Sequence, residues 1–229
     1  MTQIPTFYII ATPIGNLEDI TLRAIRILKE VDLILCEDTR TTRVLLSKYE
    51  IKTPTSSYHA KSKLSKIDDV IKMLRDGKNI ALVSDAGTPA ISDPGSLLIQ
   101  KVREELGDEV IVSPIPGPSA LISALSVSGL TGGSFTFYGF LPHKKGRETI
   151  FKTIADSELI SAFYESPHRI EKTLESLALH VPERKIIIAR ELTKIFEQII
   201  SGTPQEIISY FTTHPDKIRG EFVVIIEGK

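Results

Sequence analysis

Six short loops rich in Ser, Thr, Asp, Pro and Gly recur along this 229-residue sequence, and each follows an apolar run typical of a buried strand. Pro and Gly keep such loops out of helices and sheets, so their backbone N–H and C=O groups stay available to a ligand. These groups can bind an adenine edge, a ribose or an amino acid moiety without large side chains. A single loop of this kind is usually only a turn and a helix cap, but six of them indicate a binding site. They span residues 12–16, 37–40, 84–89, 116–120, 165–169 and 190–194.

The elements that must position these loops are strands and helices in alternation. Apolar runs are followed by amphipathic stretches of helical spacing, which predicts an α/β fold with largely parallel, buried strands. Ligands of open α/β sheets bind outside the carboxyl ends of the strands, where these loops would lie. Asp93 and Pro94 are expected to begin one helix as N-cap and first residue, and Ser166 to cap a helix over residues 167–179. The expected strands span residues 7–11, 33–36, 55–58, 79–84, 110–113, 135–140, 159–164, 185–189 and 221–226.

One short stretch is the best candidate for a domain boundary. Pro114, Pro116, Gly117 and Pro118 crowd together there and make a stiff, turn-rich connection. The chain is long enough for two modest domains. We therefore expect an N-terminal α/β domain over residues 1–115 and a C-terminal α/β domain over residues 116–229.

Signatures of several common enzyme classes are absent from the sequence. No Gly-x-Gly, P-loop or Gly-x-Ser-x-Gly pattern occurs, and the five histidines do not fall at the spacing of a metal site. We predict neither nucleotide triphosphate hydrolysis nor a bound metal. The single cysteine, Cys36, excludes an intramolecular disulfide and fits a reducing compartment. The only apolar run near the N-terminus is too short for a signal peptide or a membrane span, so we expect a cytoplasmic protein.

The charge distribution is uneven although the formal net charge is only -1. Residues 40–66 hold seven Lys or Arg side chains and one acid, Glu50, and a second basic cluster covers residues 143–147. Clustered cations can collect phosphates, but a charge run is more often a solvated face. Charge by itself therefore leaves both interpretations open.

In combination, five segments resemble the motifs of the tetrapyrrole methylase superfamily. The resemblance runs from about Thr6 to the C-terminus. It implies a two-domain class III methyltransferase fold, usually homodimeric, that binds S-adenosylmethionine in the interdomain cleft. The segments are Thr-Pro-Ile-Gly-Asn-Leu at 12–17, Glu-Asp-Thr-Arg at 37–40, Ser-Asp-Ala-Gly-Thr-Pro-Ala-Ile-Ser-Asp-Pro-Gly at 84–95, Pro-Gly-Pro-Ser-Ala at 116–120 and Arg-Glu-Leu-Thr-Lys at 190–194.

The resemblance also implies an acceptor and a set of donor contacts. Tetrapyrrole-modifying members commonly have a Gly-rich first loop ending in Asp, and the departure at residues 12–16 argues against a corrin or porphyrin acceptor. The motifs look most like those of members that methylate a cytidine ribose 2′-hydroxyl in the decoding region of 16S rRNA. The donor contacts that the resemblance implies are Pro13, Asp85, Gly87, Thr88, Ile91, Ser119, Ala120, Tyr164, Leu192 and Gly220.

Methylation of a ribose hydroxyl calls for accurate positioning and for help with deprotonation, because a neutral hydroxyl is a poor nucleophile. Asp38, Glu165, Glu191 and Lys194 are the ionisable candidates in the strand-end loops. We hypothesise that Asp38 or Lys194 assists deprotonation, with Glu191 as a further candidate. Asp38 can equally well cap the following helix and pair with a neighbouring arginine, and Glu191 can merely fix Arg190.

An RNA acceptor gives the basic segments a role, because cationic side chains that contact phosphates release condensed counterions. Two other interpretations stay open: a superfamily member acting on a tetrapyrrole or other small acceptor, and a non-catalytic RNA-binding module. The candidate RNA contacts are Arg40, Arg43, His59, Lys144, Lys145, Arg147 and Arg169.

Overall fold

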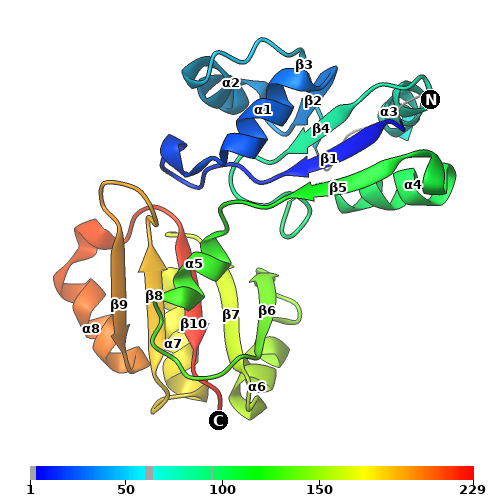
Figure 1. Ribbon diagram of the computed structural model, residues 1–229. Coiled ribbons are helices and arrows are strands. Elements are labelled where there is room, and N and C mark those ends of the chain that lie inside the picture. The colour runs from blue at the N-terminus through cyan, green and yellow to red at the C-terminus, as the bar shows by residue number, and fades with distance from the viewer. Residues whose placement is uncertain (1–3, 60–63, 94) are drawn as a thin grey trace. The chain divides into compact units, whose positions relative to one another are not determined.

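The computed structural model describes residues 4–59, 64–93 and 95–229 and divides into two compact units (Figure 1). The first unit is Met1–Ser119 and the second is Ala120–Lys229, so the division falls four residues beyond the junction expected at residue 115. Each unit has its own sheet and its own buried core. Across the described residues, no helix is both long and apolar enough to cross a membrane.

The first unit contains a five-stranded sheet in the order β3-β2-β4-β1-β5, in which every neighbouring pair is parallel. All five strands follow runs expected from the sequence, and β2 coincides with the expected residues 33–36. The fifth strand extends through Pro114, which the sequence had placed in the connection; the sheet tolerates proline there because β5 is an edge strand. The strands are β1 (Thr6–Ile10), β2 (Leu33–Cys36), β3 (Thr55–Ser57), β4 (Ile80–Val83) and β5 (Ile111–Ile115).

Helices cover both faces of this sheet, because successive strand residues point to opposite sides. Ile34 and Cys36 pack with α1 (Leu22–Glu30) and α2 (Thr39–Lys48). Leu35, which lies between them in β2, packs instead with α3 (Leu64–Arg75) and α4 (Ser96–Leu106). The strands are therefore buried on both faces, as parallel strands usually are.

Helix α4 begins later than its sequence suggests. The expected N-cap, Asp93, is not the cap: the helix starts at Ser96 after Gly95, and Pro94 lies outside the described residues. Gly95 has a φ of +143°, and a Cβ there would lie 2.9 Å from Leu82 Cδ2. The approach of the loop to β4 thus sets the start of the helix and overrides the local capping signal.

The second unit contains a sheet in the order β6-β7-β10-β8-β9, and here the expectation of largely parallel strands is wrong. Only β6 and β7 are parallel, while β7–β10, β10–β8 and β8–β9 are antiparallel. Strand β9 was also missed, because its short run Gln-Ile-Ile-Ser-Gly gains its partner only through the hairpin with β8. The strands are β6 (Phe135–Phe140), β7 (Ile160–Glu165), β8 (Ile186–Arg190), β9 (Gln198–Gly202) and β10 (Phe222–Ile226).

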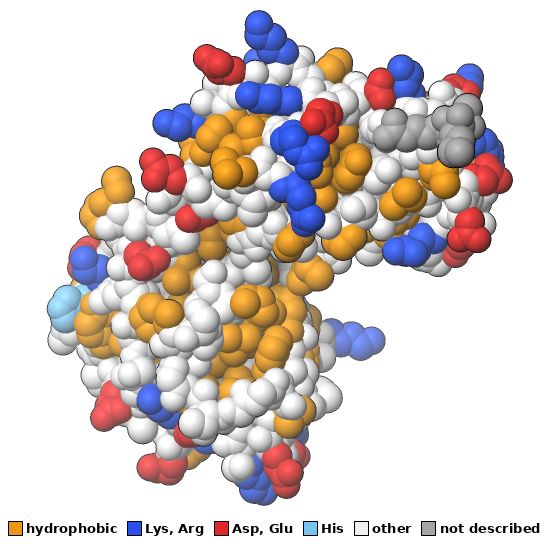
Figure 2. Space-filling view, viewed as in Figure 1, with side chains coloured by type: hydrophobic (Ala, Val, Ile, Leu, Met, Phe, Trp, Pro, Cys, Tyr) orange, Lys and Arg blue, Asp and Glu red, His pale blue; other side chains and the backbone are white. Residues whose placement is uncertain are grey.

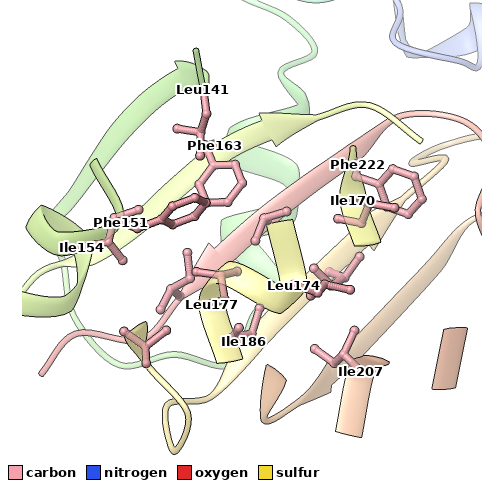
Figure 3. Close-up of a cluster of buried hydrophobic side chains, with 14 of the residues drawn as sticks. Leu141, Phe151, Ile154, Phe163, Ile170, Leu174, Leu177, Ile186, Ile207 and Phe222 are labelled. Atoms are coloured by element: carbon pink, nitrogen blue, oxygen red, sulfur yellow. The ribbon is translucent and has the colours of Figure 1, made fainter. Parts of the chain in front are cut away.

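Three helices pack on one face of this second sheet and form a continuous core with it (Figure 3). These are α6 (Arg147–Asp156), α7 (Ile170–His180) and α8 (Pro204–Thr213), while α5 (Ala120–Ser126) contacts β10 on the opposite face (Figure 1). Helix α7 begins at Ile170, so the expected cap at Ser166 is wrong; the Ser166 carbonyl instead accepts hydrogen bonds within a turn. Three short 3-10 helices complete the described structure: η1 (Leu17–Asp19), η2 (Gly107–Glu109) and η3 (Pro215–Lys217).

Candidate functional site

Four of the six loops meet at one edge of the first unit. Strands β2, β4, β1 and β5 are neighbours and parallel, so their carboxyl ends lie side by side. The loops after β1 and β4 are joined by an isolated bridge: Thr12 N–H donates to the Gly87 carbonyl at 2.9 Å, and Gly87 N–H donates to the Thr12 carbonyl at 3.0 Å. The Thr12 hydroxyl donates to the Ser84 carbonyl at 3.0 Å. We call these four loops the carboxyl edge of the first unit.

The loop after β5 joins this edge through Thr88, whose hydroxyl donates to the Pro118 carbonyl at 3.4 Å. Gly87 has a φ of +79°, and a Cβ there would lie 3.5 Å from Ile14 and 3.8 Å from the Pro118 carbonyl oxygen, so the three loops converge on one glycine. A left-handed conformation favours glycine at this position. The carboxyl edge is therefore built largely from backbone groups, as the composition of its loops suggested.

The loop after β2 joins the edge through Asp85, which accepts a hydrogen bond from the Asp38 N–H at 3.1 Å. Two further carboxyl groups lie near Asp85. Burial raises the pKa of Glu37, and the Asp93 and Asp85 carboxylates raise it further. Burial likewise raises the pKa of Asp93, and Asp85 adds to that effect against a hydrogen bond with Ser84. The carboxyl edge is thus acidic and favours a ligand that carries positive charge.

The expected donor contacts fall on both units. In the first unit, Pro13 and Gly87 are buried at the carboxyl edge, Thr88 is half-buried, and Asp85 and Ile91 are exposed. Ser119 follows the Thr88-bonded Pro118 directly. The remaining contacts belong to the second unit. Ala120 begins α5 and Tyr164 lies in β7, while Leu192 follows the end of β8 and Gly220 precedes the start of β10.

The loop after β8 is held by an ion-pair cluster of Glu191, Lys194 and Glu221, which we call the clamp. Strands β7 and β8 are both antiparallel to β10, so their carboxyl ends share an edge with the start of β10. Glu191 N–H donates to the Glu221 carbonyl at 3.1 Å, and the Lys194 ammonium bridges Glu191 at 2.9 Å and Glu221 at 3.1 Å. Glu191 and Thr193 have φ values of 49° and 66°, a conformation that non-glycine residues rarely adopt. The clamp therefore holds Leu192 in a strained loop.

The charge states of the clamp follow from its contacts. Burial raises the pKa of Glu191, but the hydrogen bonds from Lys194 and from the Glu221 backbone outweigh it and hold the pKa below its ordinary value. Burial lowers the pKa of Lys194, and the bonds to Glu191 and Glu221 outweigh that effect in turn, so this pKa is raised. Glu191 is accordingly an anion and Lys194 a cation at neutral pH. Sequence reasoning missed Glu221, because its place at the start of an apolar strand gave no sign of a polar partner.

Asp38 caps helix α2, the alternative that the sequence left open. Its carboxylate accepts the Arg40 N–H at 2.8 Å and pairs with the Arg40 guanidinium at 2.7 Å. The hydrogen bonds from the Arg40 side chain and backbone lower the pKa of Asp38 to about 2. A carboxylate with so low a pKa is a weak proton acceptor near neutral pH.

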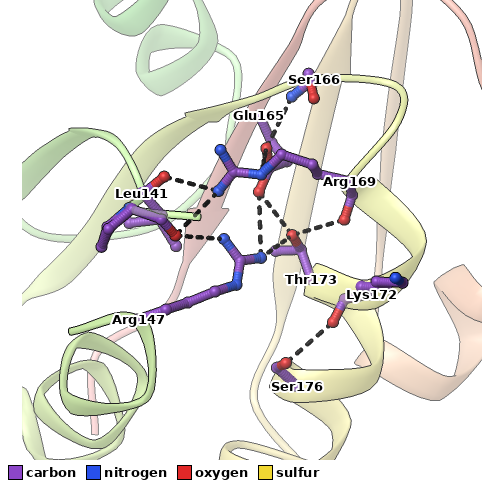
Figure 4. Close-up of polar contacts among 9 residues, drawn as sticks. Leu141, Arg147, Glu165, Ser166, Arg169, Lys172, Thr173 and Ser176 are labelled. Carbon is purple, nitrogen blue, oxygen red and sulfur yellow. Dashed lines mark hydrogen bonds and ion pairs between the residues drawn. The ribbon is translucent and has the colours of Figure 1, made fainter. Parts of the chain in front are cut away.

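Glu165 is fully buried between two arginines (Figure 4). Arg169 Nε lies 3.1 Å from one carboxylate oxygen, and Arg147 Nη2 lies 3.4 Å from the other. The Thr173 hydroxyl donates to Glu165 at 2.7 Å and accepts from Arg147 at 2.6 Å. Arg169 also donates to the Leu141 carbonyl at 2.7 Å. This network ties the end of β6 to the starts of α6 and α7, which is a structural role for Glu165.

The candidate RNA contacts divide by exposure. The side chains of Arg147 and Arg169 are only 13% and 17% exposed, and both are committed to Glu165, so the interpretation of these two as phosphate contacts is not supported by their surroundings. The others are exposed on the surface: Arg40, Arg43, His59, Lys144 and Lys145. Lys61 and Lys63 of the basic segment lie outside the described residues.

Within the described part of the chain, no group of three or more His, Cys, Asp or Glu is placed to hold a metal ion.

Comparison with known proteins finds a methylase family and relatives that are named methyltransferases. Residues 6–208 match the model of a family described as tetrapyrrole (corrin/porphyrin) methylases. The chain is 46% identical to the Thermotoga maritima protein named ribosomal RNA small subunit methyltransferase I, over 96% of this chain and 97% of that protein. It is also 46% identical to the Bacillus subtilis protein of the same name, over 96% of this chain and 74% of that one.

Two solved structures share the fold at low sequence identity. The methyltransferase CobJ superimposes with a TM-score of 0.71 at 17% identity, covering 99% of this chain and 95% of that one. The cobalt precorrin-4 methyltransferase CbiF gives a TM-score of 0.68 at 16% identity, covering 97% and 94%. At such identities the similarity is one of architecture.

Proposed function

The chain belongs to the tetrapyrrole (corrin/porphyrin) methylase family, and we propose that it is an S-adenosylmethionine-dependent methyltransferase that modifies a cytidine ribose 2′-hydroxyl in the decoding region of 16S rRNA. The observation that carries this proposal is 46% identity, along nearly the whole chain, to proteins named ribosomal RNA small subunit methyltransferase I. The protein's first-loop sequence, Thr-Pro-Ile-Gly-Asn, supports an acceptor other than a corrin or porphyrin.

The residues of the carboxyl edge fit the methyl donor. S-adenosylmethionine supplies an electrophilic methyl group on a positively charged sulfur, and the acidic edge around Asp85 favours a cationic ligand. Gly87, held left-handed by the bridge to Thr12, leaves room for the close approach of a ligand to the backbone. In this proposal the contacts from the first unit are Pro13, Asp85, Gly87, Thr88, Ile91 and Ser119, and those from the second are Ala120, Tyr164, Leu192 and Gly220.

Methyl transfer is an in-line displacement, so the main task of the protein is to hold the acceptor oxygen about 3 to 3.5 Å from the methyl carbon. Of the candidate catalytic groups, Lys194 has the charge state that suits assistance, because a cation beside a hydroxyl lowers its pKa. Glu191 then serves as a positioning residue that holds Lys194. The weak basicity of Asp38 makes it the less suitable candidate.

Two substitutions separate these roles. Asp38→Asn is expected to keep kcat within about twofold of wild type, because asparagine also caps helices well. Lys194→Met is expected to lower kcat by about 100-fold, within the usual range for proton-transfer assistance. Steady-state methyl transfer at saturating donor and RNA measures both. Wild-type turnover in both variants contradicts any role of Asp38 or Lys194 in deprotonation.

The exposed basic side chains form the proposed RNA surface. Arg40 and Arg43 lie on α2, directly after the carboxyl-edge loop that contains Asp38, and Lys144 and Lys145 lie in the loop between β6 and α6. His59 is exposed after β3 and is included in the proposal. Cations in these places can contact phosphates and fix the register of the RNA.

Neutralising the cations of α2 should change the salt dependence of RNA binding. Replacing Arg40 and Arg43 by glutamine is expected to flatten the plot of log affinity against log salt by about 0.7 for each lost contact with single-stranded RNA. Affinity measured across a salt series gives the slope. Arg103→Gln, an exposed arginine on α4 at the other face of the sheet, is the matched control. An unchanged slope in the double variant removes α2 from the RNA surface.

The proposed function is tested by radiolabelled methyl transfer to small ribosomal subunits from a strain that lacks this enzyme. Label is expected in 16S rRNA, in an alkali-resistant dinucleotide, because a 2′-O-methyl group blocks alkaline cleavage at that position. Large subunits serve as the control. Label on a base overturns the ribose assignment. Donor binding without transfer to RNA favours a small-molecule acceptor, and RNA binding without donor binding favours a non-catalytic module.

We propose a homodimer, tested by sedimentation equilibrium, and a cytoplasmic location in association with the small ribosomal subunit, tested by fractionation of cells expressing the tagged chain. We also propose that no metal takes part. Methyl transfer that persists after dialysis against a chelator supports this last point, and restoration of lost activity by a divalent cation contradicts it.

A further inference from the structure

A β-bulge in β6 changes the direction of one aromatic side chain. Phe137 pairs with Ala162, and Phe140 pairs with Tyr164, so two residues of β6 stand opposite Phe163 alone. Gly139, within this irregularity, has a φ of 62°. Strand periodicity would place residues 137 and 140 on opposite faces, but the extra residue brings Phe140 to the same face as Phe137.

The result is an aromatic cluster on the face of the second sheet that does not carry α6, α7 and α8. The ring centroids of Phe137 and Tyr164 are 5.0 Å apart and the rings meet edge to face, and the ring centroids of Phe140 and Tyr164 are 5.4 Å apart. Phe163, on the other side of the sheet, belongs to the helical core. Figure 2 shows hydrophobic side chains gathered on this face over β6 and β7.

Phe140 is the exposed member of this cluster. Phe140 is 58% exposed in the edge strand β6, whereas Phe137 and Tyr164 are partly buried. Its ring is thus supported from beneath by Tyr164 and open to solvent above. Such a ring can receive a flat ligand without rearrangement, and two χ angles are all that must be fixed.

The chain that follows Phe140 is basic. Residues 141–146 form the loop to α6, and within it His143, Lys144 and Lys145 are exposed, with no acidic residue before Glu148. The loop is anchored at its start, because Arg169 holds the Leu141 carbonyl. A fixed aromatic ring beside exposed cations is the combination with which proteins bind unstacked bases of single-stranded nucleic acid.

We infer that Phe140 is a stacking platform for an unpaired nucleobase of the RNA substrate, with Lys144 and Lys145 contacting the flanking phosphates. The inference rests on the proposed function for the identity of the nucleic acid, and it adds a base-binding subsite to the basic loop after β6. The ligand class is an unstacked base of single-stranded RNA. Stacking is sequence-tolerant, because every base presents a flat π-face.

The absence of tryptophan from the chain provides a direct probe. Phe140→Trp introduces the only indole of the chain at the proposed platform, which can be excited at wavelengths that tyrosine does not absorb. Titration with single-stranded oligocytidylate is expected to quench its fluorescence as a base stacks on the indole. The matched control is Ile199→Trp, on the same face at the opposite edge of the sheet, where the native side chain is 42% exposed. The control is expected to keep its fluorescence.

Binding measurements on three variants separate stacking from general hydrophobic packing. Phe140→Tyr keeps a ring and is expected to bind oligocytidylate as wild type does. Phe140→Leu and Phe140→Ala are expected to weaken binding by about 5-fold to 150-fold. The slope of the salt dependence should stay unchanged in all three, because Phe140 contacts no phosphate, while Lys144→Gln with Lys145→Gln should flatten it. The affinity for S-adenosylmethionine should not change.

The outcomes distinguish this inference from the proposed function. If wild type methylates 16S rRNA but Phe140→Leu binds oligocytidylate equally well, or the indole of the Phe140→Trp variant is not quenched, the platform is overturned and the proposed function stands. If that indole is quenched and Phe140→Leu binds weakly while no methyl group reaches 16S rRNA, the platform stands and the proposed function fails. A parallel loss of donor affinity, or a changed sedimentation coefficient in Phe140→Leu, assigns this face to the donor or to a subunit contact and overturns the platform.

Discussion

Glu165→Ala is expected to lower the free energy of unfolding by about 3 kcal/mol, because it leaves two largely buried guanidinium groups without their shared anion. The carboxylate has no exposed surface, and Arg147 and Arg169 approach it from the starts of separate helices. Without the anion, both arginines must be rehydrated or must leave their sites, which frees the ends of β6, α6 and α7 from each other. Urea denaturation measures the loss.

The control for this effect is Glu171→Ala, an exposed acid in the first turn of α7. It is expected to change the free energy of unfolding by no more than about 0.5 kcal/mol, as exposed surface substitutions usually do. Glu165→Gln keeps an acceptor for the Thr173 hydroxyl and is expected to fall between Glu165→Ala and wild type. Equal stability of the Glu165→Ala and Glu171→Ala variants contradicts the structural role of the network.

Gly220→Ala is expected to lower the free energy of unfolding by about 2 to 4 kcal/mol and to weaken donor binding at least about tenfold. Two costs combine. The φ of +82° is unfavourable for alanine by about 1 kcal/mol, and the added methyl group would overlap the Glu191 carboxylate, which forces the clamp to move. Leu192 and Gly220, both proposed donor contacts, then lose their positions. Urea denaturation and equilibrium binding of S-adenosylmethionine measure the two effects.

Two further variants isolate the overlap from the backbone cost. Gly129 also has a positive φ, +67°, but nothing lies within 4 Å of a Cβ there, so Gly129→Ala should show the backbone cost only. Adding Glu191→Ala to Gly220→Ala removes the overlapping carboxylate. The double variant should therefore be less destabilised than the sum of the two single variants. Additive effects, or equal effects of Gly220→Ala and Gly129→Ala, contradict the overlap.

Local patterns predicted the first unit well, for a physical reason. A buried parallel strand is a short apolar run and its crossover helix is amphipathic, so the run at residues 33–36 and the helix after it are both visible in the sequence. The second unit was predicted less well. Its antiparallel pairings with β10 join strands far apart along the chain, and the run at 198–202 holds only two apolar residues, Ile199 and Ile200.

The candidate site divides in the same way. The parallel sheet brings the loops after β1, β2, β4 and β5 to one edge, and this arrangement follows from strand direction once the strands are known. Strand direction does not determine which side chains are exposed and available to bind a ligand. Arg43 and Arg147 are both arginines in basic stretches of the sequence, yet one is exposed and the other is held by Glu165. That difference arises from a contact between β7 and α6, which no local pattern records.

The sequence by itself determined the alternation of strands and helices, the six strand-end loops and the family resemblance, because these depend on residue types at short spacing. Tertiary structure alone decided that Glu165 is an internal anion, that Glu191 and Glu221 share Lys194, and that the bulge at Gly139 turns Phe140 to the open face of its sheet. Burial, ion pairing and strand register are properties of residues brought together across the chain, and they exist only once the sheets have formed.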